Sequence, residues 1–350
     1  MAKVLSLFSG SLASRVATRI VEQHPDVECV YLLHFRSPFS REFEDLRQLV
    51  RTEWPHAIYR TQSIKKEYRR LVQITDDGEF SLALSCHNCR SLLLAKAVRY
   101  MERIEADYLV SGEVPGQGMS VTKRLRSIAR ELGVEDRILR PLCVGSSRKR
   151  GLERWAGRDG NGAPSRGASV TLAKLAERVG LDAADPMAAC HCCKLMTPGF
   201  GERVASLFGE AGFTLNALRL LDFPLFYKVS SDVKIVLARD EQEKRELQNL
   251  FLPQDLRVYP ATPHGPMTLV RADWRRRGGT EQQMVIELAA RITATFAGPK
   301  RTETVPIYYR LESEDETHLL NVNPFEDEAA IARWEDVEMI PLGQQGTAVG

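Results

Sequence analysis

The sequence lacks the features that would mark a membrane, secreted or strongly basic protein. No apolar run in its 350 residues approaches the length of a membrane span. The net charge is only +2 at pH 7, so any affinity for nucleic acid must come from local patches. There are seven cysteines, but five of them crowd into two short clusters. This pattern indicates metal or redox chemistry in a reducing compartment instead of a disulfide framework, and we expect a cytoplasmic protein with no membrane partner.

The stretch nearest the N-terminus predicts a strand, a tight turn and a helix. An apolar run, residues 4–8, stops at Ser9-Gly10-Ser11, and Leu12, Val16 and Ile20 then follow at helical spacing. Small residues let a backbone approach a ligand closely, and the free N–H groups of a helix's first turn attract anions. Phosphate is therefore the expected ligand, and an ordinary strand-to-helix turn is the alternative.

Strands and helices alternate through the first 142 residues. This alternation predicts βαβ units and a mostly parallel sheet flanked by helices. Strands are expected at 28–35, 57–60, 106–110 and 138–142, with helices at 13–23, 40–53, 85–104 and 120–132. Ligands of such sheets bind at the carboxyl ends of the strands, where His34-Phe35 and the Gly-rich stretch that begins Ser111-Gly112-Glu113 are expected to lie.

The two cysteine clusters favour a metal site. Cys86 and Cys89 form a CxxC pair that we expect at a helix N-terminus, where the helix dipole lowers thiol pKa. Residues 190–193 are Cys-His-Cys-Cys, of which only one or two can bind the same ion. Three thiolates leave one iron of a [4Fe–4S] cluster open. The alternatives are Zn²⁺ bound by three thiolates and His87 or His191, or surface thiols without metal.

Basic residues concentrate in two places. Residues 145–169 are rich in Gly, Ser and Arg and include Arg148-Lys149-Arg150, which predicts either a solvated linker or a segment that contacts RNA phosphates. Arg275 and Arg276 follow Trp274, a basic and aromatic mixture that RNA-binding surfaces use. A solvated loop is the alternative there.

These observations predict four segments. They are a nucleotide-binding α/β domain at 1–144, a basic linker and helix with the 190–193 cysteine cluster at 145–198, a small α+β RNA-binding-type domain at 199–298 and an acidic tail at 299–350. A β-hairpin is expected over residues 226–238, across a turn at 230–232.

The assembled motifs resemble the PP-loop ATP pyrophosphatase superfamily, in particular its tRNA thiolation branch of thiouridine synthase-like enzymes. Residues 7–14 lie where that family has its SGGxDS loop, and Leu33-His34-Phe35 matches its second nucleotide loop. Residues 111–117, SGEVPGQ, resemble its TGEVxGQ segment. The cysteine pair and Cys193, which precedes Pro198, match its three cysteines. Residues from about 226 to 298 are similar to an NFACT-R-like RNA-binding domain shared with ribosome quality-control factors.

The resemblance implies an ATP-dependent tRNA uridine thiolation. The base carbonyl would be adenylated and a sulfur nucleophile, from a persulfide carrier or sulfide, would then displace AMP. The implied ligands are ATP, Mg²⁺ and a [4Fe–4S] cluster, the last held by the catalytic cysteines Cys86, Cys89 and Cys193. The implied ATP-binding residues are Ser9, Gly10, Ser11, Ser14, His34, Phe35, Ser111, Gly112 and Glu113.

The PP-loop motif of this chain departs from the family pattern. Ala13 stands where the family has an aspartate that helps hold magnesium and triphosphate, and Ser11 replaces the second glycine. Loss of one such electrostatic stabiliser costs roughly factors of 10²–10³ in rate. Two alternatives therefore stand beside the enzyme: a nucleotide- or RNA-binding protein without adenylation chemistry, and an ATP-independent iron–sulfur enzyme that handles sulfur.

Overall fold

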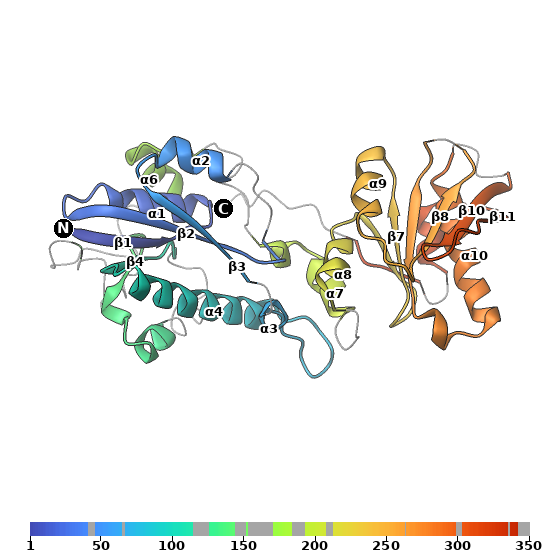
Figure 1. The fold of residues 1–350 in the computed structure, drawn as a ribbon, viewed down its shortest axis with the longest axis horizontal. Coiled ribbons are helices and arrows are strands. Elements are labelled where there is room, and N and C mark those ends of the chain that lie inside the picture. The colour runs from blue at the N-terminus through green and yellow to red at the C-terminus, as the bar shows by residue number, and fades with distance from the viewer. Residues whose placement is uncertain are drawn as a thin grey trace. The chain divides into compact units, whose positions relative to one another are not determined.

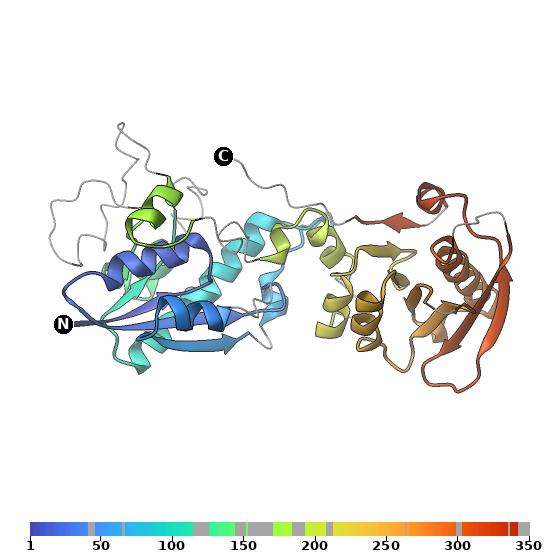
Figure 2. The same ribbon diagram turned by 90° about the horizontal axis from the view of Figure 1, so that it is seen from above.

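The computed structural model spans residues 1–350. It describes all of them except 41–45, 65–66, 115–125, 144–151, 153–170, 184–192, 208–212, 263, 299–302, 335–336 and 342–350. The chain forms two compact units (Figures 1 and 2). The first comprises Met1–Gln73 and Ser81–Met196, and the second comprises Ile74–Phe80 and Thr197–Gln345.

The first unit is built on a five-stranded parallel sheet. The strands are β1 (Ala2–Leu7), β2 (Val27–Arg36), β3 (Ile58–Ser63), β4 (Tyr108–Val110) and β5 (Ile138–Leu139), in the order β3-β2-β1-β4-β5. The parallel sheet flanked by helices confirms the predicted α/β class. From β1 the chain builds outward to β3 and then returns to β4 on the other side. The strand order thus reverses between β1 and β4, which is where ligands of open α/β sheets bind.

Helices cover this sheet on both sides. They are α1 (Leu12–Glu22), α2 (Leu46–Glu53), α3 (Tyr68–Leu71), α4 (Leu82–Arg103) and α6 (Leu172–Arg178), with short 3-10 turns at Glu135–Arg137 and Lys194–Met196. The expected helix at 120–132 is helical over its described residues 126–131. Most of the basic linker lies outside the described residues, but Leu152 is buried in the core of this unit.

The start of α1 follows from its sequence. Ser11 is the N-cap residue, and its hydroxyl accepts the N–H of Ser14. The apolar side chains at helical spacing bury one face against the sheet. On another side, the buried guanidinium of Arg15 pairs with Glu53 of α2, with Nε 3.1 Å from Oε2. The core and this ion pair together hold the N-terminus of α1 beside the end of β1.

The second unit contains a seven-stranded antiparallel sheet. Its strands are β6 (Leu225–Lys228), β7 (Lys234–Ala238), β8 (Leu256–Pro260), β9 (Met267–Arg271), β10 (Val305–Leu311), β11 (His318–Val322) and β12 (Glu338–Met339), in the order β11-β10-β8-β9-β7-β6-β12. The pairing of β6 with β7 confirms the predicted hairpin. The described residues of this unit also form five α-helices: α7 (Phe200–Ala205), α8 (Leu215–Leu220), α9 (Glu241–Gln248), α10 (Gly279–Thr295) and α11 (Glu328–Ala332). A 3-10 turn, η4 (Trp274–Arg276), precedes α10.

The segment predicted as an acidic tail is instead part of this sheet. β10 pairs with both β8 and β11, and β12 pairs with β6. Ile307 is fully buried, and Val322, Ile331 and Val337 complete the core beneath α10. The acidic residues of this stretch lie between buried apolar positions, so the charge of the segment concealed its strand pattern. The predicted boundary at 298 is therefore wrong, because the sheet continues beyond it.

Arg203 connects several segments of this unit through hydrogen bonds inside its core. Its guanidinium is fully buried and donates hydrogen bonds of 2.5–2.9 Å to four backbone carbonyls, those of Leu221, Phe223, Pro224 and Ile340. It also stacks on Phe226, 5.1 Å from the ring centroid. Burial lowers the pKa of Arg203 to about 10, although Asp222 opposes the shift, so the side chain stays charged at neutral pH. The residue joins α7 to the segment after α8 and to the end of β12.

Among the described residues, no helix has both the length and the apolar character needed to cross a membrane.

Candidate functional site

The turn between β1 and α1 carries three serine hydroxyls that bond to one another. Ser9 Oγ lies 2.9 Å from Ser11 Oγ and 3.3 Å from Ser14 Oγ, and Ser14 Oγ donates to the Ser11 carbonyl at 2.9 Å. Gly10 makes the turn possible because its φ of 84° lies in the left-handed region. The N–H groups of Leu12 and Ala13, in the first helical turn, have no helical acceptor. The turn therefore presents donors of the kind that bind phosphate oxygens.

The loop after β4 packs directly on this turn. A Cβ on Gly112 would lie 2.9 Å from both Cα and N of Ser14, and 3.1 Å from the carbonyl carbon of Ala13. Only glycine allows this approach. The next residue, Glu113, accepts a hydrogen bond from Ser111 Oγ at 3.1 Å. The structure thus brings together two of the predicted loops, Ser9–Ser14 and Ser111–Glu113, at the carboxyl ends of β1 and β4.

Two residues that the sequence did not single out complete this edge. Arg140 follows β5, and its Nε lies 3.4 Å from Glu113 Oε2. Both atoms are buried and have no hydrogen-bond partner among the described residues. The Cys143 thiol donates to the Glu113 carbonyl at 3.1 Å. Burial, together with the charge of Glu113, raises the pKa of Cys143 to about 11, so it is a protonated thiol and not a nucleophile at neutral pH. The available signal was a charged residue, Arg140, inside the apolar stretch that the sequence predicts as a strand over 138–142.

His34 positions the turn from the second strand. Its Nδ1 lies 3.0 Å from the Phe8 carbonyl, while the Phe8 N–H donates to the Leu33 carbonyl at 2.9 Å. Burial lowers the pKa of His34, so the ring is neutral at pH 7 and donates from Nδ1. Phe35, the next residue, is buried in β2. The role that the structure supports for His34 is thus to hold the backbone of Phe8, the residue that precedes the Ser9–Ser11 turn.

The loop fits a phosphate better than it fits a magnesium ion. Serine hydroxyls and helix N–H groups match phosphate oxygens, whereas Mg²⁺ is usually bound through carboxylates and water. Ala13 supplies no carboxylate, and Glu113 already faces Arg140. These residues therefore fit a nucleotide phosphate without fitting the predicted Mg²⁺.

The cysteine pair does not lie at the helix N-terminus that the sequence predicts. α4 begins at Leu82, with Ser81 as its N-cap, so Cys86 and Cys89 are its fifth and eighth residues. The N–H groups without a helical acceptor belong to the first turn, which ends before Cys86. Cys86 and Cys89 are half-buried and three residues apart, so they share one side of α4.

The described residues do not assemble a metal centre. Cys193 lies in an isolated bridge with Ser40, and no three His, Cys, Asp or Glu side chains within the described part of the chain come close enough to hold an ion. Cys190, His191 and Cys192 lie outside the described residues. The iron–sulfur and zinc alternatives therefore stay predictions.

The predicted RNA contacts divide into exposed and structural arginines. Arg275 is exposed, and Arg276 is 81% exposed while pairing with Asp273 at 3.0 Å. In contrast, Arg271 makes two hydrogen bonds to the buried Asp255, at 2.6 and 3.0 Å. Arg277 likewise pairs with Asp232 at 2.6 Å. Only the exposed pair is available to phosphates. Arg148, Lys149 and Arg150 lie outside the described residues.

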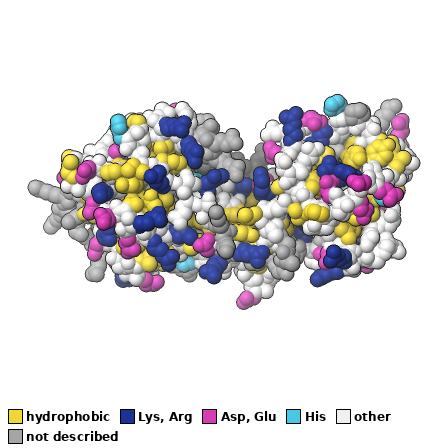
Figure 3. Space-filling model, in the orientation of Figure 1, with side chains coloured by type: hydrophobic (Ala, Val, Ile, Leu, Met, Phe, Trp, Pro, Cys, Tyr) yellow, Lys and Arg dark blue, Asp and Glu magenta, His cyan; other side chains and the backbone are white. Residues whose placement is uncertain are grey.

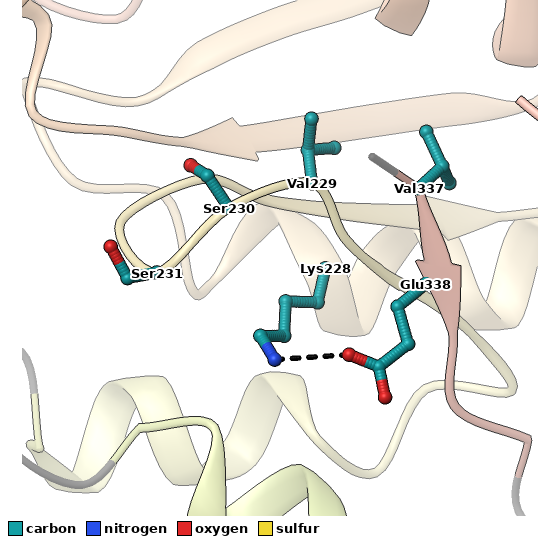
Figure 4. Close-up of a pocket in the computed structure, with 6 residues that line it drawn as sticks. All are labelled: Lys228, Val229, Ser230, Ser231, Val337 and Glu338. Carbon is teal, nitrogen blue, oxygen red and sulfur yellow. Dashed lines mark hydrogen bonds and ion pairs between the residues drawn. The ribbon is translucent and has the colours of Figure 1, made fainter. Parts of the chain in front are cut away.

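A shallow pocket of about 420 Å³ lies beside β6 and β12 (Figure 4). It is lined by Lys228, Val229, Ser230, Ser231, Val337 and Glu338. Lys228 Nζ lies 3.0 Å from Glu338 Oε2 across it, as the dashed line shows. Because this ion pair joins the two strands, the pocket is a crevice at a strand pair and not a charged ligand site. Figure 3 shows lysine and arginine side chains mixed with acidic ones on the visible face, as expected for a chain with little net charge.

Comparison with known proteins identifies part of the second unit. Residues 226–335 match the family described as the NFACT protein RNA binding domain. No curated protein matches the chain. One solved structure, the C-terminal part of the fibronectin/fibrinogen-binding protein from Streptococcus suis, is 15% identical over 38% of this chain, with a TM-score of 0.26. The matched region spans 66% of that structure. The family match supports the predicted C-terminal RNA-binding domain and extends it through β10, β11 and α11.

Proposed function

We propose that the protein is an ATP-dependent enzyme that thiolates uridine in tRNA. The observation that carries the proposal is the combination of two parts in one chain. The second unit contains an RNA-binding-type domain, and in the α/β unit the Gly112 loop packs on the serine-rich turn at the N-terminus of α1. The α/β unit would hold ATP, and the second unit would hold the RNA. This assignment also rests on the resemblance of residues 7–14 and 111–117 to the thiolation branch.

The reaction needs two displacements. The uridine carbonyl oxygen attacks the α-phosphorus of ATP and pyrophosphate leaves. A sulfur nucleophile from an external donor then attacks the base carbon and AMP leaves. In this proposal the Leu12 and Ala13 N–H groups bind phosphate oxygens, because they lie at the positive end of the α1 dipole. The Ser14 hydroxyl gives up its hydrogen bond to the Ser11 carbonyl when ATP binds and donates a hydrogen bond to a phosphate oxygen instead.

Binding of ATP tests the first half of the proposal. Isothermal titration should show that Ser14→Ala weakens ATP binding by about 10-fold or more, since hydrogen bonds to charged groups contribute about 1.5–3 kcal/mol. Ser127→Ala is the matched control, because its hydroxyl bonds to Glu131 on an exposed helix face. Equal affinities for both variants and the wild type would show that the turn does not bind the nucleotide.

The thiolation itself is tested in cells. Thionucleosides of tRNA from a deletion strain should lack one species, and a plasmid copy should restore it. Iron and sulfide analysis after anaerobic purification reports on the cluster separately. Unchanged thionucleosides in the deletion strain would refute the enzymatic assignment.

The second candidate function is RNA binding without adenylation, and Ala13 favours it. A methyl group cannot hold magnesium, and the three serines of the turn already bond to one another. Ala13→Asp separates the two candidates through pyrophosphate release with tRNA present. An active enzyme should change modestly, whereas a chain that has lost the chemistry should gain release.

A further inference from the structure

One face of the second sheet carries tyrosines and arginines over β8, β10 and β11. α10 packs on the opposite face of these strands, as Figure 1 shows. Residues alternate between the two faces of a strand. Val258 and Ile307 belong to the core beneath α10, so Tyr259 and Tyr308 project from the other face. By the same alternation, Leu319, between two residues that face the core, also lies there.

These three side chains form a row across the strands. Tyr308 of β10 is in register with Tyr259 of β8 and with Leu319 of β11. The tyrosine rings lie 5.8 Å apart, tilted by 43°. Both are partly exposed, and Leu319 is 55% exposed. A sheet face that only meets solvent is usually polar, whereas this one exposes a large apolar side chain beside two aromatic rings. Such a composition is typical of a surface that binds a partner by stacking.

Two arginines lie next to the row, and only one is committed to a partner. Arg257 and Arg310 face each other in register, two positions along from the tyrosines. Arg257 pairs with Glu312 at 2.6 and 3.1 Å. Arg310 is partly exposed and has no ion-pair partner among the described residues. The row is thus flanked by an uncompensated positive charge, which complements a phosphate.

We propose that Tyr259 and Tyr308 stack bases of single-stranded RNA, with Arg310 contacting the adjacent phosphate. Aromatic side chains on a sheet stack unpaired bases, and a neighbouring cation binds the backbone. The β10–β11 turn carries Glu314, Asp315 and Glu316, which repel phosphates, so the RNA strand is expected to cross the β-strands and not follow them toward that turn. The inference rests on the proposed RNA binding of this domain and names its single-stranded ligand class.

We call Tyr259, Tyr308 and Arg310 the platform. Its role is tested by measuring the affinity of the full chain for a fluorescein-labelled 12-nucleotide single-stranded RNA by fluorescence anisotropy. Tyr308→Ala should weaken binding roughly 5- to 100-fold, from the loss of one stacked base. Tyr308→Phe is the matched control and should bind within about twofold, since the ring is kept. A blunt duplex of the same length should bind more weakly than the single strand and should not respond to either variant.

Substitutions of the exposed Leu319 provide a second test, which leaves both tyrosines unchanged. Leu319→Lys should tighten RNA binding, and Leu319→Glu should weaken it, because the two variants place opposite charges beside the phosphates. A protein partner or a second copy of the chain on this face would lose affinity with both variants, which would overturn the proposal.

The outcomes separate this proposal from the broader one. If the wild type binds RNA and Tyr308→Ala binds equally well, the platform is wrong and RNA binding stands. If the wild type binds no RNA at micromolar concentration, both fail. Ultraviolet crosslinks on β8 or β10 peptides support the platform, and crosslinks confined to the Arg275–Arg276 loop contradict it.

Discussion

Gly112→Ala is the sharpest test of the site at the sheet edge. The new Cβ would lie 2.9–3.1 Å from three atoms of the α1 backbone, and the two contacts at 2.9 Å are closer than Cβ atoms come to other atoms in proteins. Helix backbone cannot yield as a flexible side chain can, so either the loop after β4 or the start of α1 must move. Overpacking of this kind costs about 3 kcal/mol.

That cost corresponds to a measurable shift in unfolding temperature. A domain of 150–250 residues loses roughly 2–4 °C for each kcal/mol, so the transition of the first unit should fall by about 6–12 °C. Differential scanning calorimetry measures it. ATP affinity should fall in parallel, because the two loops that the proposal assigns to the nucleotide would separate.

Two glycines serve as controls for Gly112. Gly133→Ala meets no atom within 4 Å but has a φ of +68°, so it should cost only about 1–2 kcal/mol of backbone strain. Gly279→Ala, at the start of α10, also meets open space and should be neutral or slightly stabilising. If Gly112→Ala unfolded at the wild-type temperature, the packing of the β4 loop on α1 would be refuted.

Three further predictions concern Arg203, His34 and Arg276. Arg203→Met should destabilise the second unit by about 4 kcal/mol in urea titration, because it leaves buried carbonyls unpaired, and Arg203→Lys should lose less. If Arg203→Met unfolded at the same urea concentration as the wild type, the stabilising role of Arg203 would be contradicted. Because burial lowers the pKa of His34 below 6.5, only the unfolded chain takes up a proton as pH drops through that value, so stability should fall from pH 7.5 to 5.5. His34→Asn, which keeps a donor near the Nδ1 position, should show a smaller pH dependence in urea unfolding; an unchanged one would place the titration elsewhere. Arg276→Ala should change the free energy of unfolding by no more than about 0.5 kcal/mol, and it should reduce the slope of log RNA affinity against log salt concentration by about one. The matched variant Arg130→Ala should alter neither quantity.

The family match changes how the C-terminal half is understood. It runs from β6 to just beyond α11, so β10 and β11, which follow residue 298, lie within the region that matches the RNA-binding domain. Trp334, which stacks edge-to-face on Phe325 at 5.4 Å, closes the core at that end. Arg291 lies over both rings, at 4.2 and 4.6 Å. A truncation at residue 298 would remove three strands of the sheet.

The sequence by itself determined the parallel α/β sheet and the turn at Ser9–Ser11. Both depend on local patterns: apolar strands at regular spacing, and small residues between a strand and a helix. It also indicated the β-hairpin over residues 226–238. These features arise from neighbours in the chain, so periodicity and turn composition suffice to find them.

Only the tertiary structure decided which charged residues are free of ion pairs with buried or half-buried partners and thus available to bind a ligand. Arg271, Arg275, Arg276 and Arg277 look alike in sequence, but Arg271 is held by Asp255 of the loop before β8, and Arg277 by Asp232 of the β6–β7 turn. The same holds for the strands concealed in an acidic segment, whose partners are far away in sequence. Ion pairs and sheet register join residues across long sequence separations, and no local pattern records them.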